Sequence, residues 1–335
     1  MQSRKSEACK MSISVVMATF NGEDYIEKQL DSILEQSLVP DEIIICDDCS
    51  EDSTSMILEQ YLNRYFKNAK VSVRVFNNEK RLGYALNFKK AIEASNGDVV
   101  FLSDQDDIWH KDKIKKCMDI LIKHPEILAL STGYDLIDEK GDLLKSPFYK
   151  CLFNLNSSIF QKLFPITKIK FKSFIKHPRY PGMAMVFRRR LWNIMKYEGI
   201  VDWGYKPAHD WALNFSAAVH EGMYFYAEKM ILYRQHRCNS AGILYMQKKE
   251  NLYVQRVNII KSLINNFNSV GNCGNEIREK VNAALQFQIK RLKLINRGSI
   301  FKLICSEIMN LRFISLKSIA GDMYVLLKRG NICIK

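Results

Sequence analysis

Residues 98–107, Asp-Val-Val-Phe-Leu-Ser-Asp-Gln-Asp-Asp, join a continuous apolar run to a cluster of carboxylates within ten positions. The run Asp98–Ser103 is short and contains valine and phenylalanine, which is typical of a strand buried on both faces. Three aspartates follow its carboxyl end. A buried strand that ends in acidic residues predicts a parallel sheet with a polar site at its edge.

The same alternation of apolar runs and helical patterns extends on both sides of this stretch. We expect strands at 12–17, 42–46, 71–76, 98–103 and 127–131, and helices at 24–36, 52–66, 84–95 and 111–123. Strand and helix alternating at this spacing predict parallel βαβ units, hence a doubly wound α/β domain. Polar residues follow three of the strands, at 18–21, 47–48 and 104–107, where ligands bind in such sheets.

The second part of the chain is less regular. Residues 140–182 contain several prolines and predict loops over the sheet. We expect a strand at 182–187, a helix at 209–220 and a hairpin formed by 224–227 and 230–234. From about residue 246 to the end the pattern is helical, and basic residues alternate with apolar ones.

Composition narrows the class of protein. The 335 residues are 47% hydrophobic and 26% charged, which is ordinary for a globular protein and excludes disordered and collagen-like chains. We find no run of about 18 uncharged apolar residues and no signal-peptide pattern in residues 1–17, so we expect a cytoplasmic protein. The nine cysteines are scattered and predicted to be reduced; Cys46 and Cys49 have CxxC spacing but no second pair to complete a zinc site.

The charge is unevenly distributed. When Lys and Arg are counted as +1 and Asp and Glu as −1, residues 1–150 have a net charge of −6 and residues 151–335 a net charge of +20. Together these give the total of +14. A nucleic acid, an anionic membrane or a phosphorylated substrate would each suit the basic half. Because residues 290–329 combine cations with amphipathic spacing, we expect peripheral membrane contact. Docking of these helices on the catalytic domain or on a second subunit stays open.

The acidic residues suggest a chemistry. Crowded carboxylates repel one another, and a divalent cation such as Mg²⁺ or Mn²⁺ among Asp104, Asp106 and Asp107 would relieve that repulsion. The alternative is an acidic surface turn. Asp48 could accept hydrogen bonds from a ribose or a base, or cap the following helix. We find neither G-x-G-x-x-G nor G-x-x-x-x-G-K-[ST], which disfavours dinucleotide oxidoreductases and P-loop enzymes.

Four segments, 17–21 (MATFN), 46–50 (CDDCS), 97–98 (GD) and 103–107 (SDQDD), together resemble the family 2 glycosyltransferases over roughly residues 12–240. The resemblance implies a GT-A fold, Rossmann-like with a mostly parallel sheet flanked by helices. It also implies a nucleotide-diphosphate sugar donor, a divalent metal, Mg²⁺ or Mn²⁺, and inversion at the anomeric carbon. Cys49 departs from the family, which usually has glycine in this DDGS position.

Site residues follow from the resemblance, position by position. Asp210, in AHDW, matches the catalytic base, with Asp202 as the fallback candidate; a helix-starting acid stabilised by the helix dipole is the alternative for Asp210. The nucleotide-sugar would contact Ala18, Thr19, Asn21, Asp48, Gly83, Asn87, Asp104 and Gln105. The metal would contact Asp106 and His236. Acceptor or accessory contacts would come from Trp109, His209, Trp211, Gln235 and Asn239.

Segments 101–109 (FLSDQDDIW) and 233–239 (YRQHRCN) are similar to bacterial rhamnosyltransferase-like members of the family. This favours dTDP-rhamnose or a UDP-sugar as the donor. Trp109 and Trp211 could stack on sugar rings or lie in the core. Residues 11–240 would form the catalytic domain, divided into a nucleotide-sugar-binding half (11–132) and an acceptor-binding half (133–240), and 241–335 a basic helical extension.

The sequence therefore predicts an inverting glycosyltransferase of cell-surface polysaccharide synthesis (O-antigen or capsule), peripheral at the inner membrane face. Its acceptor would be a hydroxyl of a glycan or lipid-linked sugar. A catalytically inactive glycosyltransferase-like subunit and a nucleotide-sugar pyrophosphorylase are the alternatives, although Ala18–Tyr25 lacks the basic Gly-rich loop of the latter. We find no nucleic-acid-binding module. The sugar, the linkage and the oligomeric state stay open.

Overall fold

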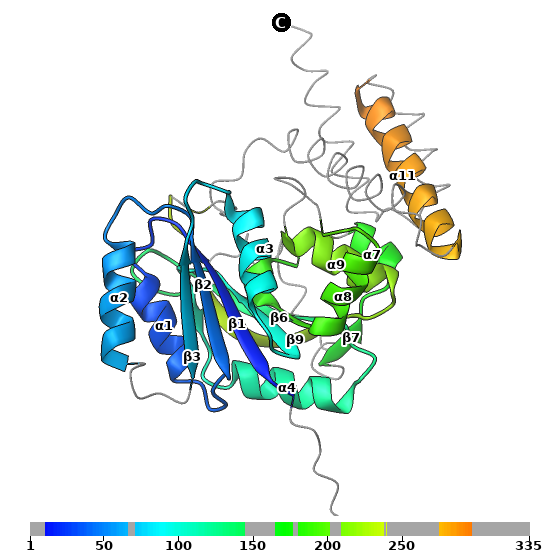
Figure 1. Cartoon of the computed structure of the whole chain (residues 1–335). Helices are drawn as coiled ribbons and strands as arrows, with labels where there is room; N and C mark the ends of the chain where they lie inside the picture. Colours follow the sequence, from blue (N-terminus) through cyan, green and yellow to red (C-terminus); the bar gives the residue numbers. More distant parts are fainter. Residues whose placement is uncertain are drawn as a thin grey trace, which may run out of the picture.

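The computed structural model describes residues 11–65, 71–144, 165–176, 180–201, 209–237, 239 and 275–296. They form one nine-stranded sheet with helices on both faces (Figure 1). The strand order is β3-β2-β1-β4-β8-β6-β9-β5, and β7 pairs with β9. This confirms the α/β fold with a mostly parallel sheet.

The first half of the sheet consists of parallel βαβ units. It contains β1 (Ile13–Thr19), β2 (Glu42–Asp47), β3 (Ser72–Asn77) and β4 (Val99–Ser103), connected by α1 (Ile26–Leu34), α2 (Thr54–Tyr65) and α3 (Tyr84–Ala94). Nearly all of the residues in β1, β2 and β4 are buried, because helices cover both faces of the sheet. Their register places the carboxyl ends of these strands at one edge.

The second half of the sheet is mixed. Here β8 (Met185–Arg188) runs antiparallel between β4 and β6 (Ala129–Ile137), and β9 (Met223–Arg234) is parallel to β6. The short strands β5 (Ile108–Trp109) and β7 (Ile166–Lys168) run antiparallel to β9. The remaining helices are α4 (Lys113–Lys123), α7 (Phe171–Lys176), the 3₁₀ turn η1 (Gly182–Ala184), α8 (Arg189–Tyr197), α9 (His209–Val219) and α11 (Asn275–Asn296).

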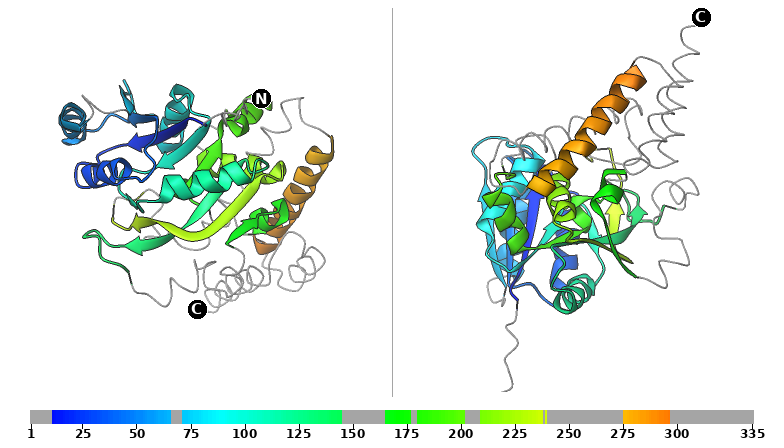
Figure 2. Two further views of the ribbon diagram at one scale, coloured as in Figure 1. Left: turned by 90° about the horizontal axis from the view of Figure 1, so that it is seen from below. Right: turned by 90° about the vertical axis from the view of Figure 1, so that its right-hand side faces the viewer.

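Two apolar cores lie on the two faces of the sheet. Alternate residues of β1 serve both, since Val15 and Met17 join one core and Val16 the other. Helices α1, α2 and α4 cover the first face, and α3, α8 and α9 cover the second (Figures 1 and 2). Val281 and Leu285 of α11 join the second core, so this helix packs on the face that α3, α8 and α9 cover.

The expected hairpin at 224–234 is wrong, because β9 is one twelve-residue strand. Register shifts on either side of Gly133 in β6 accommodate its extra residues. The strand expected at 182–187 divides into η1 and β8. Pattern reading also missed β5, β7, α7 and α8. Of the C-terminal extension, residues 241–274 and 297–335 lie outside the described residues. In the described part of the chain, we find no helix with the length and hydropathy needed to cross a bilayer.

Candidate active site

The ends of β1, β2 and β4 meet at one edge of the sheet and carry most of the expected site residues. Thr19 pairs with Asp47, and Met17 pairs with Ser103 just before the acidic run. Since parallel strands point the same way, residues that follow them in sequence become neighbours in space. The predicted gathering of the three polar segments is therefore present in the fold.

The two aspartates after β2 are surrounded by hydrogen-bond donors. Asp47 accepts hydrogen bonds from the Thr19 hydroxyl (2.8 Å), the Ser50 hydroxyl (2.5 Å) and the Ser50 N–H (2.9 Å). Asp48 accepts from the side-chain amide of Asn78 and from the N–H groups of Leu82 and Gly83, all within 2.9 Å. Both carboxylates therefore fix the loops at this edge.

The other nucleotide-sugar candidates take part in the same loops. Asn87 is buried and donates to the Cys46 carbonyl at 2.7 Å. Gly83, at φ 79°, precedes α3 in a conformation that favours glycine. Cys49, which departs from the DDGS pattern, also has a positive φ of 61°, a conformation that favours glycine.

Gln105 connects the acidic turn to the end of β1. Its side-chain oxygen accepts the Phe20 N–H at 2.8 Å, and its side-chain nitrogen donates to the Phe20 carbonyl at 2.9 Å. A Cβ on Gly22 would lie 2.5 Å from that oxygen, so the absence of a side chain at Gly22 leaves room for the Gln105 amide. Asn21 has φ 48° and accepts from the Glu51 N–H, while Ala18 packs against the second core.

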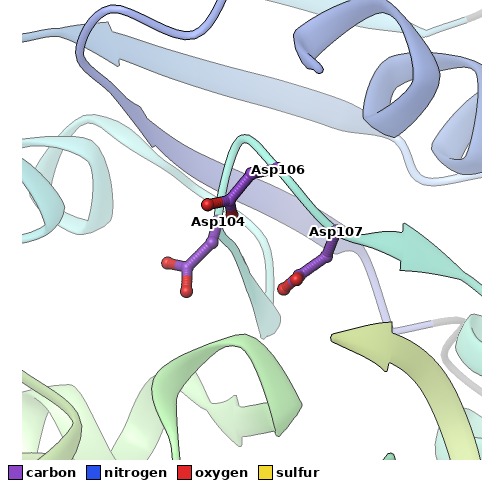
Figure 3. Close-up of side chains that lie close together, drawn as sticks. All are labelled: Asp104, Asp106 and Asp107. Atoms are coloured by element: carbon purple, nitrogen blue, oxygen red, sulfur yellow. The ribbon is translucent and has the colours of Figure 1, made fainter. Parts of the chain in front are cut away.

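Asp104, Asp106 and Asp107 project from the turn after β4 (Figure 3). Each offers a ligand atom, and these atoms lie within 4.8 Å of one another. Burial and the charges of Asp106 and Asp210 raise the pKa of Asp104 to about 8. Burial and the charges of Asp106 and Asp104 raise the pKa of Asp107. The buried Asp107 Oδ2 has no hydrogen-bond partner among the described residues. This donor set fits a hard divalent cation such as Mg²⁺ or Mn²⁺.

The end of β9 and the segment after it surround the acidic turn on its other side. His236 Nε2 lies 2.7 Å from Asp106 Oδ2, and the Asn239 side chain donates to the same oxygen at 3.3 Å. Arg234 donates from its N–H to Asp107 and from its side chain to the Asp106 carbonyl. Gln235 is buried and donates to the Arg234 carbonyl. Asp106 and His236, the two residues predicted to contact a metal, thus lie in direct contact with each other.

Asp210 lies in the first turn of α9. Burial raises its pKa to about 6, although the N–H groups of Trp211 and Gly182 favour the charged form. Its charge acts on Asp104 and on Tyr84, so α9 places this carboxylate near the acidic turn and α3. A carboxylate with a pKa of this kind is suited to act as a general base. The fallback candidate Asp202 lies outside the described residues.

The neighbouring aromatic residues differ in exposure. The buried His209 stacks on Phe88 with a centroid distance of 4.0 Å, and burial lowers its pKa to about 3. Trp211 packs beside Phe174. Trp109 is only 4% exposed, and Lys113 Nζ lies 3.4 Å from its ring centroid. Sugar stacking and a place in the core were both open for Trp109, and its burial favours the core.

The sequence analysis missed four residues around the site, namely Tyr25, Tyr84, Lys113 and Arg234. Arg234 is fully buried, and its guanidinium also lies over the Tyr25 ring at 4.8 Å. Tyr84 is 48% exposed beside His209 and so offers an accessible aromatic ring near Asp210. Lys113 has no exposed surface. The sequence could have indicated this burial, because Lys113 falls on the apolar stripe of the helix that includes Cys117 and Leu121.

The chain is similar in sequence to known proteins. The relative RfbG, a dTDP-rhamnosyl transferase of Shigella flexneri, is 30% identical over 243 residues, 68% of this chain and 73% of RfbG. TuaG of Bacillus subtilis, described as a putative teichuronic acid biosynthesis glycosyltransferase, is 36% identical over 132 residues, 39% of this chain and 50% of TuaG. This chain therefore aligns with half the length of TuaG.

A solved structure supports the fold. The mannosyltransferase PcManGT of Pyrobaculum calidifontis, in complex with GDP-Man and Mn²⁺, superposes with a TM-score of 0.54 at 16% identity, covering 98% of this chain and 82% of PcManGT. The family model described as "Glycosyl transferase family 2" matches residues 14–195. The match covers more than half of the chain and includes the acidic turn, so this protein belongs to glycosyltransferase family 2 and is a glycosyltransferase.

Proposed function

We propose that this glycosyltransferase is metal-dependent and inverting, and that it moves a sugar from a nucleotide-diphosphate donor to a hydroxyl of a glycan or lipid-linked acceptor. The observation that carries the proposal is the pair of acidic groups at one edge of the sheet. A cluster of three aspartates suited to a cation faces Asp210, a separate buried carboxylate whose pKa is raised to about 6.

The division of labour follows from these positions. Asp104, Asp106 and His236 would hold the metal and the diphosphate end of the donor, with Asn239 orienting Asp106. When bound, Mg²⁺ or Mn²⁺ offsets negative charge on the departing nucleotide diphosphate. The loops fixed by Asp48, Gly83, Asn87 and Gln105 would line the nucleotide, together with Ala18, Thr19 and Asn21. Residues 11–132 would thus supply the donor half, and 133–240 the acceptor half.

Asp210 would act on the acceptor. Its carboxylate takes the proton of the attacking hydroxyl as that oxygen bonds to the anomeric carbon, and the bond from that carbon to the diphosphate oxygen breaks. Attack from the face opposite the leaving group inverts the anomeric configuration. His209, Trp211 and the exposed ring of Tyr84 surround this carboxylate and would contact the acceptor or orient the base.

The donor and the pathway rest on the relatives. Similarity to a dTDP-rhamnosyl transferase favours dTDP-rhamnose as the donor, with a UDP-sugar as the alternative. Similarity to a protein assigned to teichuronic acid biosynthesis favours assembly of a cell-surface polysaccharide. We include contact with the inner face of the membrane in the proposal because the 151–335 half carries +20 of net charge.

Ligand binding tests the proposal directly. Thermal shift and calorimetry with UDP-, GDP-, dTDP- and CMP-sugars, each with and without Mn²⁺, should identify one nucleotide that stabilises the protein only when the metal is present. The Asp106→Asn variant is the control and should lose the metal-dependent part of the stabilisation. If none of the nucleotide-sugars bound to the folded wild-type protein, the proposed donor site would be wrong. That result would favour a non-catalytic binding subunit.

A further inference from the structure

Lys113, the first residue of α4, is buried without any exposed surface. Its Nζ donates to the Met183 carbonyl at 3.0 Å and lies 3.4 Å from the centroid of the Trp109 ring. Its charge also acts on Asp104 and Asp107. A buried ammonium group is costly unless it is compensated, so its presence on an apolar helix face calls for an explanation.

The residue that Lys113 contacts belongs to η1, the three-residue turn Gly182–Ala184. Gly182 precedes Met183 in η1 and lies against the start of α9, where its N–H favours the charged form of the Asp210 carboxylate. A Cβ on Gly182 would lie 2.6 Å from His209 Nε2 and 3.4 Å from Asp210 Cβ. Lys113 therefore holds η1 from one side, while His209 and Asp210 pack closely against Gly182 on the other.

We propose that Lys113 is a positioning residue that holds η1 in place, and with it the Gly182 N–H that orients the Asp210 carboxylate. The proposal deepens the proposed function, on which it rests, by connecting the acidic turn to the base through Lys113, Met183 and Gly182. Burial lowers the pKa of Lys113 to about 7, and both the charged and the neutral amine can donate to the Met183 carbonyl. The charged form also offsets the nearby carboxylates.

Other groups face Asp210 and are part of the test. The charge of Asp210 raises the pKa values of Asp104 and Tyr84, and His209 lies beside it in α9. Burial lowers the pKa of His209 to about 3, so it stays neutral near pH 7. The effect of a substitution at Lys113 is therefore measured most directly at the Gly182 amide, rather than from the pH dependence of the whole protein.

The experiment measures amide hydrogen exchange at Gly182 in full-length, metal-free protein. Pro181–Gly182 is the one Pro–Gly pair in the sequence, so carbonyl-¹³C proline with ¹⁵N glycine selects its amide signal. In Lys113→Met, which keeps the apolar stem but removes the ammonium, we expect exchange at Gly182 to become at least tenfold faster. The pKa of Asp210, followed with carboxyl-¹³C aspartate and assigned with Asp210→Asn, should rise because the charged form loses an oriented N–H donor.

Lys116→Met is the matched control. Lys116 lies on the same helix, is partly exposed and pairs with Glu228, so both readouts should stay at the wild-type values. If Lys113→Met does not fold, Lys113→Gln replaces it; its shorter amide cannot span the same distance to Met183, and the same changes are expected.

Unchanged Gly182 exchange in a folded Lys113 variant would overturn the proposal. A higher Asp210 pKa with unchanged exchange would also overturn it, since Lys113 would then act only as a distant charge. Neither readout needs a sugar or a turnover, so a failure of the proposed function in the donor panel would be distinct from a failure here.

Discussion

Two groups of aspartates lie at the same edge of the sheet in opposite surroundings. Asp47 and Asp48 each accept three hydrogen bonds from neighbouring loops. Asp104 and Asp107 instead face other carboxylates, and burial with this crowding raises their pKa values. The first group stabilises the loops. The second carries a repulsion that Lys113 and the Arg234 N–H offset only in part, since the pKa values stay raised. Strongly shifted pKa values of this kind are a feature of sites that bind ligands.

Asp210→Asn should have the largest effect on activity and would separate the base from the acidic turn. Amide replaces carboxylate at nearly the same volume, so the proton acceptor is lost while the fold is kept. We expect kcat to fall about 10³-fold, within the range typical of a general base. Calorimetry with the donor and Mn²⁺ should give affinities within about twofold of wild type.

The exposed Asp119 of α4 provides the control, and Asp119→Asn should leave kcat unchanged. Transfer at the wild-type rate by Asp210→Asn would remove Asp210 as the base. Loss of donor binding together with kcat would instead assign Asp210 to the donor site.

The comparison between the two groups is tested most sharply by Asp106→Asn against Asp47→Asn. Asp106 touches His236 and Asn239 in the cluster, so its variant should bind Mn²⁺ about 100-fold more weakly, with little change in stability. Asp47 bonds to Thr19 and Ser50, so its variant should lose roughly 1–3 kcal/mol of stability and bind Mn²⁺ normally. Calorimetry with Mn²⁺ alone and urea unfolding measure the two effects. If both variants lost metal binding equally, the distinction between the groups would fail.

The pH dependence of activity tests the environment of Asp210. Because burial raises its pKa from 3.8 to about 6, Asp210 takes up a proton as the pH falls through 6, and the base is lost there rather than near pH 4. We expect kcat/KM, which reports the free enzyme, to fall tenfold per pH unit below about 6.

Stability gives a second readout of the same group. The folded pKa lies above the unfolded value, so the unfolded chain binds fewer protons between pH 4 and 6, and Asp210 lowers the stability as the pH rises through that window. The gain in melting temperature of Asp210→Asn over wild type should therefore grow between pH 4 and 6 and then level off. A gain independent of pH would show that Asp210 titrates normally.

The strand ends could be predicted from the sequence, whereas the groups that each acidic residue contacts there could not. Continuous apolar runs in β1, β2 and β4 reflect burial on both faces, which a pattern detects. Whether a carboxylate meets N–H groups or other carboxylates depends on loops distant in sequence. Asp48 illustrates this, because its partners are 30 to 35 residues further along the chain.

The second half of the fold was harder to predict for a related reason. In β9, polar residues in mid-strand suggested a turn, but Glu228 and Lys229 pair with Lys116 and Asp135 from neighbouring elements. The role of Lys113 was equally hidden, since the carbonyl it contacts is 70 residues away. Local patterns report burial well, whereas the partners of buried polar groups are set by tertiary contacts.

Cys49→Gly should have the smallest effect and tests how firmly the loop held by Asp47 and Asp48 fixes its own geometry. Cys49 lies at φ 61°, where a side chain costs about 1 kcal/mol and glycine does not. Opposing this, glycine has greater freedom in the unfolded chain, and the contact of Cys49 Sγ with the Asn78 carbonyl is lost. Because these effects offset one another, we expect a change in unfolding free energy below about 1 kcal/mol and unchanged donor affinity. A loss of donor affinity without a loss of stability would show that the Cys49 side chain itself contacts the nucleotide, which would make this loop part of the binding site as well as its support.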